Sequence, residues 1–211
     1  MMVRCLFYLH ESGFFRKAAF LFADFRDNKP SRFHTFLRIG TKNMPLFLPR
    51  RRFRRITDIT ADYLNENGIR ALILDVDNTL STHHSQTPLD GVDGWLRYME
   101  SRGIKLLILS NSKRERVEPF AKLLSLDFLP MGCKPLPFGL MKAKRRLGFK
   151  ASETAMIGDQ IFTDMIGANL CGMHTILLEP ILLEDGRGFK FKRRLEKPFI
   201  ARYERKYGNG R

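Results

Sequence analysis

From residue 56 onward the sequence alternates between short continuous apolar runs and longer segments with hydrophobic residues at helical spacing. Short runs such as ALIL and IKLLIL are typical of parallel strands that are covered on both faces. We therefore predict five strands, over residues 71–74, 104–109, 128–130, 154–157 and 174–178.

Helices are predicted before and between these strands. Their expected ranges are 57–67, 95–102, 112–124, 138–147 and 161–170. A glycine closely follows four of them, and glycine takes the left-handed conformation at a helix end without steric cost. Ser112 and Glu115 have the S-x-x-E spacing of a capping box, which indicates that the third helix opens there.

The order of these elements defines a fold class. Repeated strand–helix units with right-handed crossovers give an open, mostly parallel sheet with helices on both faces. The sequence therefore predicts an α/β fold, a three-layer sandwich built on a Rossmann-like parallel sheet. In such sheets ligands bind outside the carboxyl ends of the strands.

Reactive side chains stand directly after most of the predicted strands. Asp75 and Asp77 follow the first strand, Ser110 and Asn111 the second, Lys134 comes shortly after the third, and Asp159 follows the fourth. Parallel strands end at the same edge, so these groups are expected to gather there. We take this edge as the candidate site.

Carboxylates gathered at one edge repel each other unless a cation lies between them. Oxygen-only ligands suit Mg²⁺, which usually binds through one or two carboxylates together with a substrate phosphate. No His/Cys cluster favours zinc, and the three cysteines at 5, 133 and 171 form no paired motif. The two aspartates after the first strand therefore indicate a magnesium site that also takes phosphate.

The net charge of +15 is unevenly distributed. Residues 1–55 hold 13 Lys/Arg against 3 Asp/Glu, residues 56–178 hold 14 against 14, and residues 179–211 hold 10 against 5. A neutral middle with basic ends suits contact with an anionic surface, either lipid or nucleic acid. The alternative is that the basic ends only keep the protein soluble.

These patterns divide the chain into four parts: an N-terminal extension over 1–43, a basic segment over 44–55, the α/β domain over 56–180 and a basic tail over 181–211. Residues 1–43 would be disordered or a transit-like or membrane-surface segment, or Met44 would be the natural start. No apolar stretch approaches the roughly 18 residues needed to cross a bilayer.

The motifs together resemble those of the haloacid dehalogenase superfamily of phosphohydrolases. They stand in order as DVDNT at 75–79, Ser110 in LILSNS, Lys134 in GCKP and GDQIFTD at 158–164. The resemblance covers roughly residues 56–180. It implies a Mg²⁺-dependent phosphatase that forms an aspartyl-phosphate.

The resemblance also implies a role for each matching residue. Asp75 would be the nucleophile, Asp77 the general acid and base, Ser110 and Asn111 hydrogen-bond partners of the phosphoryl oxygens, and Lys134 the compensating charge. Asp159 would hold Mg²⁺ with the Asp75 carboxylate and the Asp77 carbonyl, while Asp164 would orient metal-bound water. An Asp one turn into a helix is also explained by the helix dipole.

Spacing limits what can cover the site. Between Asp77 and Ser110 lie 32 residues, and between Ser110 and Lys134 lie 23, too few for a cap domain of about 50 residues. A capless site favours a phosphate on something large or embedded. The chain looks like subfamily IIIA and its YqeG-like group, similar to phosphatidylglycerophosphate phosphatases, on LPRRRFRRITDIT, DVDNTL, GDQIFTD and RRLEKPF.

That closer resemblance implies hydrolysis of phosphatidylglycerophosphate to phosphatidylglycerol, a step toward cardiolipin, at a membrane surface. We expect a cytoplasmic protein docked on the inner leaflet, bacterial rather than organellar. Basic and aromatic residues at both ends would contact the leaflet: Arg50, Arg51, Arg52, Arg54, Arg55, Lys192, Arg193 and Arg194, with Phe53, Phe189 and Phe191 entering the interface.

Two alternatives remain from the sequence. Subfamily IIIA also includes phosphatases of sugars, phosphoproteins and nucleic-acid ends, which an open site would equally serve. A protein that binds nucleic acid or ribosomes through its basic ends would also fit the charge distribution. The intact set of Asp75, Asp77, Lys134 and Asp159 favours an enzyme.

Overall fold

The computed structural model describes residues 46–82, 85–181 and 187–208, the first three of the last segment by backbone only. The predicted extension over 1–43 lies outside these residues, as do most of the positions between the last strand and the C-terminal helix. Within the described part of the chain, no helix is long and apolar enough to cross a membrane.

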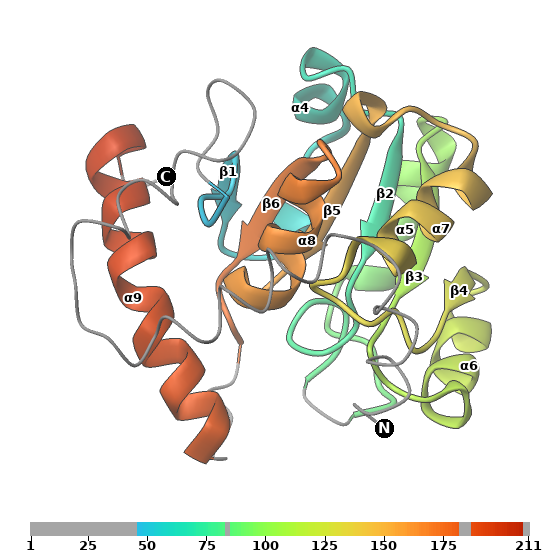
Figure 1. Ribbon diagram of the computed structural model, residues 1–211. Coiled ribbons are helices and arrows are strands. Elements are labelled where there is room, and N and C mark those ends of the chain that lie inside the picture. The colour runs from blue at the N-terminus through green and yellow to red at the C-terminus, as the bar shows by residue number, and fades with distance from the viewer. Residues whose placement is uncertain (1–45, 83–84, 182–186, 209–211) are drawn as a thin grey trace, which may run out of the picture. The chain divides into compact units, whose positions relative to one another are not determined.

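The core of the fold is a six-stranded sheet in the order β1-β6-β5-β2-β3-β4, in which every neighbouring pair is parallel (Figure 1). The strands are β1 Arg51–Phe53, β2 Ala71–Leu74, β3 Lys105–Leu109, β4 Asp127–Leu129, β5 Thr154–Gly158 and β6 His174–Leu178. The predicted α/β class with a parallel Rossmann-like sheet is confirmed.

Helices connect these strands, and a further helix follows the last strand. They are η2 Ile56–Asp58, α4 Ala61–Glu66, α5 Val92–Ser101, α6 Arg114–Leu123, α7 Pro137–Leu147, η3 Ala151–Glu153, η4 Ile161–Met165, α8 Ile166–Leu170 and α9 Arg187–Tyr207. The turn η4 is π-helical, which is common next to functional sites.

Alternate residues of the strands build two separate cores, one on each face of the sheet. Leu72 and Leu74 of β2 pack with residues of α4, α5 and α6. Ile73, between them, packs on the other face with residues of α7 and α8. Successive side chains of a strand point to opposite faces, so the two cores give the three layers.

Three predicted helix starts were wrong, including that of α5, which begins at Val92 and not at residue 95. The first helix begins at Ala61 and not at residue 57, because the Thr60 side chain accepts the Tyr63 N–H and caps it there. The capping box predicted at Ser112 does not form: α6 begins at Arg114 with Lys113 as its N-cap. The Ser112 hydroxyl instead accepts a hydrogen bond from Arg116, at 3.1 Å.

The strand β1 and the helix α9 were not predicted. β1 extends the sheet beyond β6, with Arg52 opposite Leu177. One face of α9 packs on the domain through Tyr203, which is fully buried, and Phe199, which stacks on Phe47 with ring centroids 4.8 Å apart. The terminal segments therefore contribute to the domain core.

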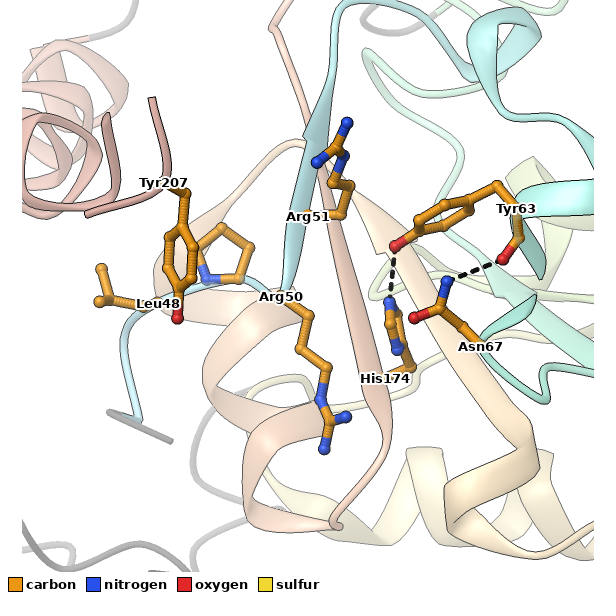
Figure 2. Close-up of a pocket in the computed structure, with 8 residues that line it drawn as sticks. Leu48, Arg50, Arg51, Tyr63, Asn67, His174 and Tyr207 are labelled. Atoms are coloured by element: carbon orange, nitrogen blue, oxygen red, sulfur yellow. Dashed lines mark hydrogen bonds between the residues drawn. The ribbon is translucent and has the colours of Figure 1, made fainter. Parts of the chain in front are cut away.

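A cavity of about 380 Å³ lies at the amino ends of β1 and β6 (Figure 2). Its lining includes Tyr63 and His174, whose hydroxyl and Nε2 are 2.9 Å apart, and Asn67, whose amide donates to the Tyr63 carbonyl. The motif residues follow the carboxyl ends of the strands, so this cavity is at the opposite edge from them.

The burial of His174 makes stability depend on pH. Burial, with Arg50 adding to it, lowers the pKa of His174 from 6.5 to about 4. Between these values the unfolded chain binds more protons, so the folded state should lose on the order of 2–3 kcal/mol as the pH falls. We expect His174→Gln to remove this part of the pH dependence in urea denaturation at about pH 7 and pH 4.5. A variant that keeps the wild-type difference would contradict the expectation.

Candidate active site

The centre of the predicted site is a buried ion-pair cluster beyond the carboxyl end of β2. The Lys134 Nζ atom lies 2.6 Å from Asp75 Oδ1 and 2.7 Å from Asp164 Oδ1. The contact with Asp75 is a hydrogen bond, whereas the contact with Asp164 is an ion pair without hydrogen-bond geometry. All three side chains are buried.

Burial and charge act against each other in this cluster. Burial raises the pKa of Asp75 to about 7, although Lys134 opposes the shift. For Lys134 burial favours the neutral amine, but Asp164 and Asp75 outweigh it and raise its pKa above the ordinary value. The ammonium group is therefore the charge that makes the two carboxylates tolerable in this buried position.

A third carboxylate completes the cluster. Oxygen atoms of Asp75, Asp159 and Asp164 lie within 4.8 Å of one another. Burial raises the pKa of Asp159 well above its ordinary value, while the neighbouring Arg193 opposes this shift. The Asp159 Oδ1 atom is buried without a hydrogen-bond partner, and a buried oxygen of this kind suits a metal ion. The arrangement fits a divalent cation held by oxygen ligands.

The GDQIFTD sequence determines how the loop after β5 folds. Asp164 Oδ2 accepts the Gln160 N–H at 3.2 Å, which folds the start of η4 back over the strand end. A Cβ atom at Gly158 would overlap the Asp164 carboxylate, so glycine is required there. This spacing places Asp159 and Asp164 at the same cluster.

The predicted Ser110 and Asn111 lie beside the Lys134 loop. The Asn111 amide donates to the Lys134 carbonyl at 3.0 Å and accepts the Lys134 N–H at 2.7 Å, and so fixes the main chain there. Ser110 Oγ accepts the Ser112 N–H at 3.1 Å. The contacts of both residues with phosphoryl oxygens stay a prediction.

Asp77 lies apart from the carboxylate cluster. Its carboxylate pairs with Arg116 of α6, a residue that the sequence did not indicate. Arg116 also donates to Ser112 Oγ, so the start of α6 is tied to the end of β3. The metal contact predicted for Asp77 was through its main-chain carbonyl, which does not require its side chain to join the cluster.

Two further residues of the site, which the sequence did not indicate, belong to α9. Arg193 contacts the carbonyl and the carboxylate of Asp159, and Glu196 accepts the Ile161 N–H at 2.7 Å. Both were part of the RRLEKPF segment, which was interpreted as a lipid-facing tail. The spacing of Phe199 and Tyr203, four residues apart, was the available signal for a helix packed on the domain.

A family model described as haloacid dehalogenase-like hydrolase matches residues 50–172. The chain belongs to this family, as its motifs predicted. The probable phosphatase YqeG of Bacillus subtilis strain 168 is 33% identical over 160 residues, which cover 76% of this chain and 93% of the relative. The protein is thus a phosphatase of the haloacid dehalogenase type.

The chain is also similar to more distant proteins. Phosphatidylglycerophosphate phosphatase 1, chloroplastic/mitochondrial, of Arabidopsis thaliana is 25% identical over 180 residues, covering 80% of this chain but 48% of the relative. The crystal structure of 3-deoxy-D-manno-octulosonate 8-phosphate phosphatase from Yersinia pestis is 17% identical, covers 72% of this chain and 93% of that chain, and has a TM-score of 0.41.

Removal of the Lys134 charge tests the electrostatic role of this residue. Lys134→Met would leave two buried carboxylates without their cation, so we expect the metal-free protein to lose about 3–5 kcal/mol in its free energy of unfolding. Urea denaturation in the presence of a chelator measures this loss. Lys142→Met, an exposed lysine of α7, is the matched control. Equal losses for the two variants would refute the role.

Proposed function

We propose that the protein is a Mg²⁺-dependent phosphomonoesterase that works through an aspartyl-phosphate on Asp75 and acts on an anionic phospholipid, most specifically phosphatidylglycerophosphate. The observation that carries the proposal is the buried cluster of Asp75, Lys134, Asp159 and Asp164 at the carboxyl edge of the sheet. Its groups have the chemistry that phosphoryl transfer requires: a nucleophile, a fixed cation and metal ligands.

The first step would form the aspartyl-phosphate. Lys134 holds Asp75 Oδ1, so Oδ2 is the atom assigned to attack phosphorus. A bond forms between this oxygen and phosphorus, the bond to the leaving alcohol oxygen breaks, and Asp77 gives that oxygen a proton. The Lys134 ammonium offsets the negative charge that nucleophile and phosphate bring together.

The second step would release phosphate. Asp77, now a carboxylate, takes a proton from a water molecule whose oxygen attacks phosphorus. The bond between phosphorus and Asp75 breaks, so the nucleophile returns to its starting state and inorganic phosphate leaves. Arg116 contacts the Asp77 carboxylate and would orient it through both steps.

Metal ligands for the proposed reaction come from the same cluster. Asp75, Asp159 and the Asp77 carbonyl would hold Mg²⁺, and Asp164 would orient its bound water. When bound, Mg²⁺ neutralises charge on the phosphoryl oxygens. The unpartnered Oδ1 of Asp159 supports this assignment, because a cation would satisfy that buried oxygen.

Access to the site supports a large or embedded substrate. Among the described residues, the segment from β2 to β3 contains α5 and, before it, the connection over 75–91 with isolated bridges at Ser81, and no separate domain covers the strand ends. One of the proteins similar to this chain is a phosphatidylglycerophosphate phosphatase, which supports the lipid substrate. An open site in a protein with basic ends is compatible with a headgroup that stays in its membrane.

Basic and apolar residues near the site would provide the membrane contact. Arg54 and Arg55 are exposed just after the carboxyl end of β1, at the same edge as the cluster. On α9, Phe191 is 62% exposed and shares a helix face with the exposed Arg194, three residues further on. We propose that these four residues meet the inner leaflet of the bacterial cytoplasmic membrane.

Three residues expected at the leaflet are engaged inside the protein, which corrects the sequence-based expectation. Arg52 pairs with Glu204 at 2.6 Å, and Arg193 pairs with Asp159. Phe53 packs against the core beside Tyr63, with ring centroids 5.2 Å apart. Opposite charges and apolar neighbours within the fold hold them there. The side chain of Phe189 lies outside the described residues.

The catalytic assignment predicts that the reaction depends on the Asp75 carboxylate as its nucleophile. With Mg²⁺ present, we expect the purified protein to release phosphate from micellar phosphatidylglycerophosphate in preference to soluble phosphomonoesters. Asp75→Asn should lower this rate by on the order of 10⁴-fold or more, because the variant lacks the nucleophile. Asp90→Asn, which changes an exposed aspartate in the same way, should keep the wild-type rate.

The outcomes separate mechanism from substrate. Turnover of soluble esters alone, lost in Asp75→Asn, would keep the mechanism and discard the lipid. Turnover of neither substrate by the wild type would contradict the proposed activity as a whole. Chelation of Mg²⁺ should stop the reaction, and addition of Mg²⁺ should restore it.

The membrane contact has its own test. Replacing Arg54 and Arg55 together by Gln should weaken binding to anionic vesicles by about 2 kcal/mol, or about 30-fold, since each basic residue near the surface contributes about 1 kcal/mol. The control replaces Lys142 and Arg145 of α7, which removes the same charge from exposed positions. Cosedimentation at fixed salt measures both. Equal weakening would show that only net charge matters.

A further inference from the structure

The helix α9 reaches the candidate metal site through one arginine. The Arg193 Nη1 atom donates to the Asp159 carbonyl oxygen at 2.6 Å, and Nη2 contacts Asp159 Oδ2. A guanidinium that contacts the main chain and the side chain of the same residue fixes the orientation of that side chain relative to the backbone. Asp159 is 2% exposed, so these contacts form away from solvent.

A glutamate three residues further along α9 completes the contact. Glu196 accepts the Ile161 N–H through Oε1 at 2.7 Å and the Arg193 Nη1 hydrogen through Oε2 at 3.1 Å. It is 2% exposed, and burial raises its pKa, with Arg193 opposing. Residues 159 and 161 are therefore both held by α9, one by the arginine and the other by the glutamate.

The remaining contacts of α9 explain why Arg193 and Glu196 are held in place. Phe199, on the same helix face as Glu196, lies 6.0 Å from Phe162 between ring centroids, and Phe162 belongs to η4, directly after the Asp159 loop. Tyr203 is fully buried four residues later. The stripe of 193, 196, 199 and 203 has helical spacing, so one face of α9 packs on the domain along most of its length.

The resulting orientation of Asp159 leaves one of its carboxylate oxygens available within the cluster. Arg193 contacts Oδ2, and Oδ1 stays buried without a hydrogen-bond partner in the cluster that also contains Asp75 and Asp164. A buried polar atom without a partner is destabilising, so the fold maintains this oxygen against a penalty. A cation bound at Oδ1 would remove the penalty without displacing Arg193.

We propose that Arg193 and Glu196 are positioning residues that hold Asp159 ready for the metal, which makes α9 part of the active site. The inference rests on the proposed metal-dependent function. It assigns the segment after the family-matched residues 50–172 a role in the reaction that is separate from membrane contact.

Electrostatics alone predicts the opposite effect of Arg193 on metal affinity, because the arginine is a cation close to a metal ligand. Coulomb repulsion between Arg193 and the metal would weaken metal binding, and removal of the arginine would then tighten it. Residues that orient a metal ligand have the contrary effect, because their removal typically costs 10–100-fold in metal affinity. The sign of the change in affinity thus separates positioning from repulsion.

The experiment is Mg²⁺ titration of the full-length protein by calorimetry, without substrate. We expect Arg193→Met to weaken Mg²⁺ binding by about 10–100-fold, and Arg193→Lys to weaken it less, because lysine keeps the charge but not the fork that contacts the carbonyl oxygen and the Oδ2 atom of Asp159. Arg202→Met makes the same substitution at an exposed position of α9 and should leave the affinity unchanged. Circular dichroism and thermal melts confirm that each variant folds.

Each result has one meaning. Unchanged or tighter binding in Arg193→Met would overturn the positioning role while leaving the proposed function intact. Absence of Mg²⁺ binding in the wild type would instead overturn the metal-dependent function itself. If Arg193→Met does not fold, Arg193→Lys decides: weaker binding than in Arg202→Met supports the role, and wild-type affinity refutes it.

Discussion

The energetic constraint at the centre of this fold is the burial of several carboxylates at one edge of a sheet. Asp75, Asp159 and Asp164 lie within 4.8 Å of one another, and water is too scarce there to screen their repulsion. Lys134 compensates two of them and Arg193 the third. The positions of the Lys134 loop and of α9 are therefore tied to the same electrostatic requirement.

Parallel strand order explains why the sequence could locate most of this cluster. Each apolar run ends at the same edge, so the residues after β2, β3 and β5 had to meet once those runs were recognised as strands. Asp75, Ser110 and Asp159 are each found there. The same pattern predicted the fold class, because continuous apolar runs separated by helical spacing admit few other arrangements.

Arg116, Arg193 and Glu196 could not be found in this way. Arg116 of α6 contacts Asp77 across 39 residues of sequence, so no local spacing links the two residues. Arg193 and Glu196 act across 34 and 35 residues, and within a basic stretch they have no local feature that distinguishes a buried charge from a solvated one. Short-range sequence patterns specify helices and strands, whereas the contacts of these three residues depend on how the helices and strands pack together.

The two edge strands of the sheet, β1 and β4, are three residues long. An exposed strand edge offers unpaired backbone groups to other chains, and short edges limit the length of any intermolecular pairing. On β1, the exposed Arg51 adds a positive charge at the strand edge and so like-charge repulsion between copies, whereas the charge of Arg52 is compensated by Glu204. The architecture thus disfavours fibre-like association at both ends of its sheet, a benefit for a protein whose proposed site must remain uncovered.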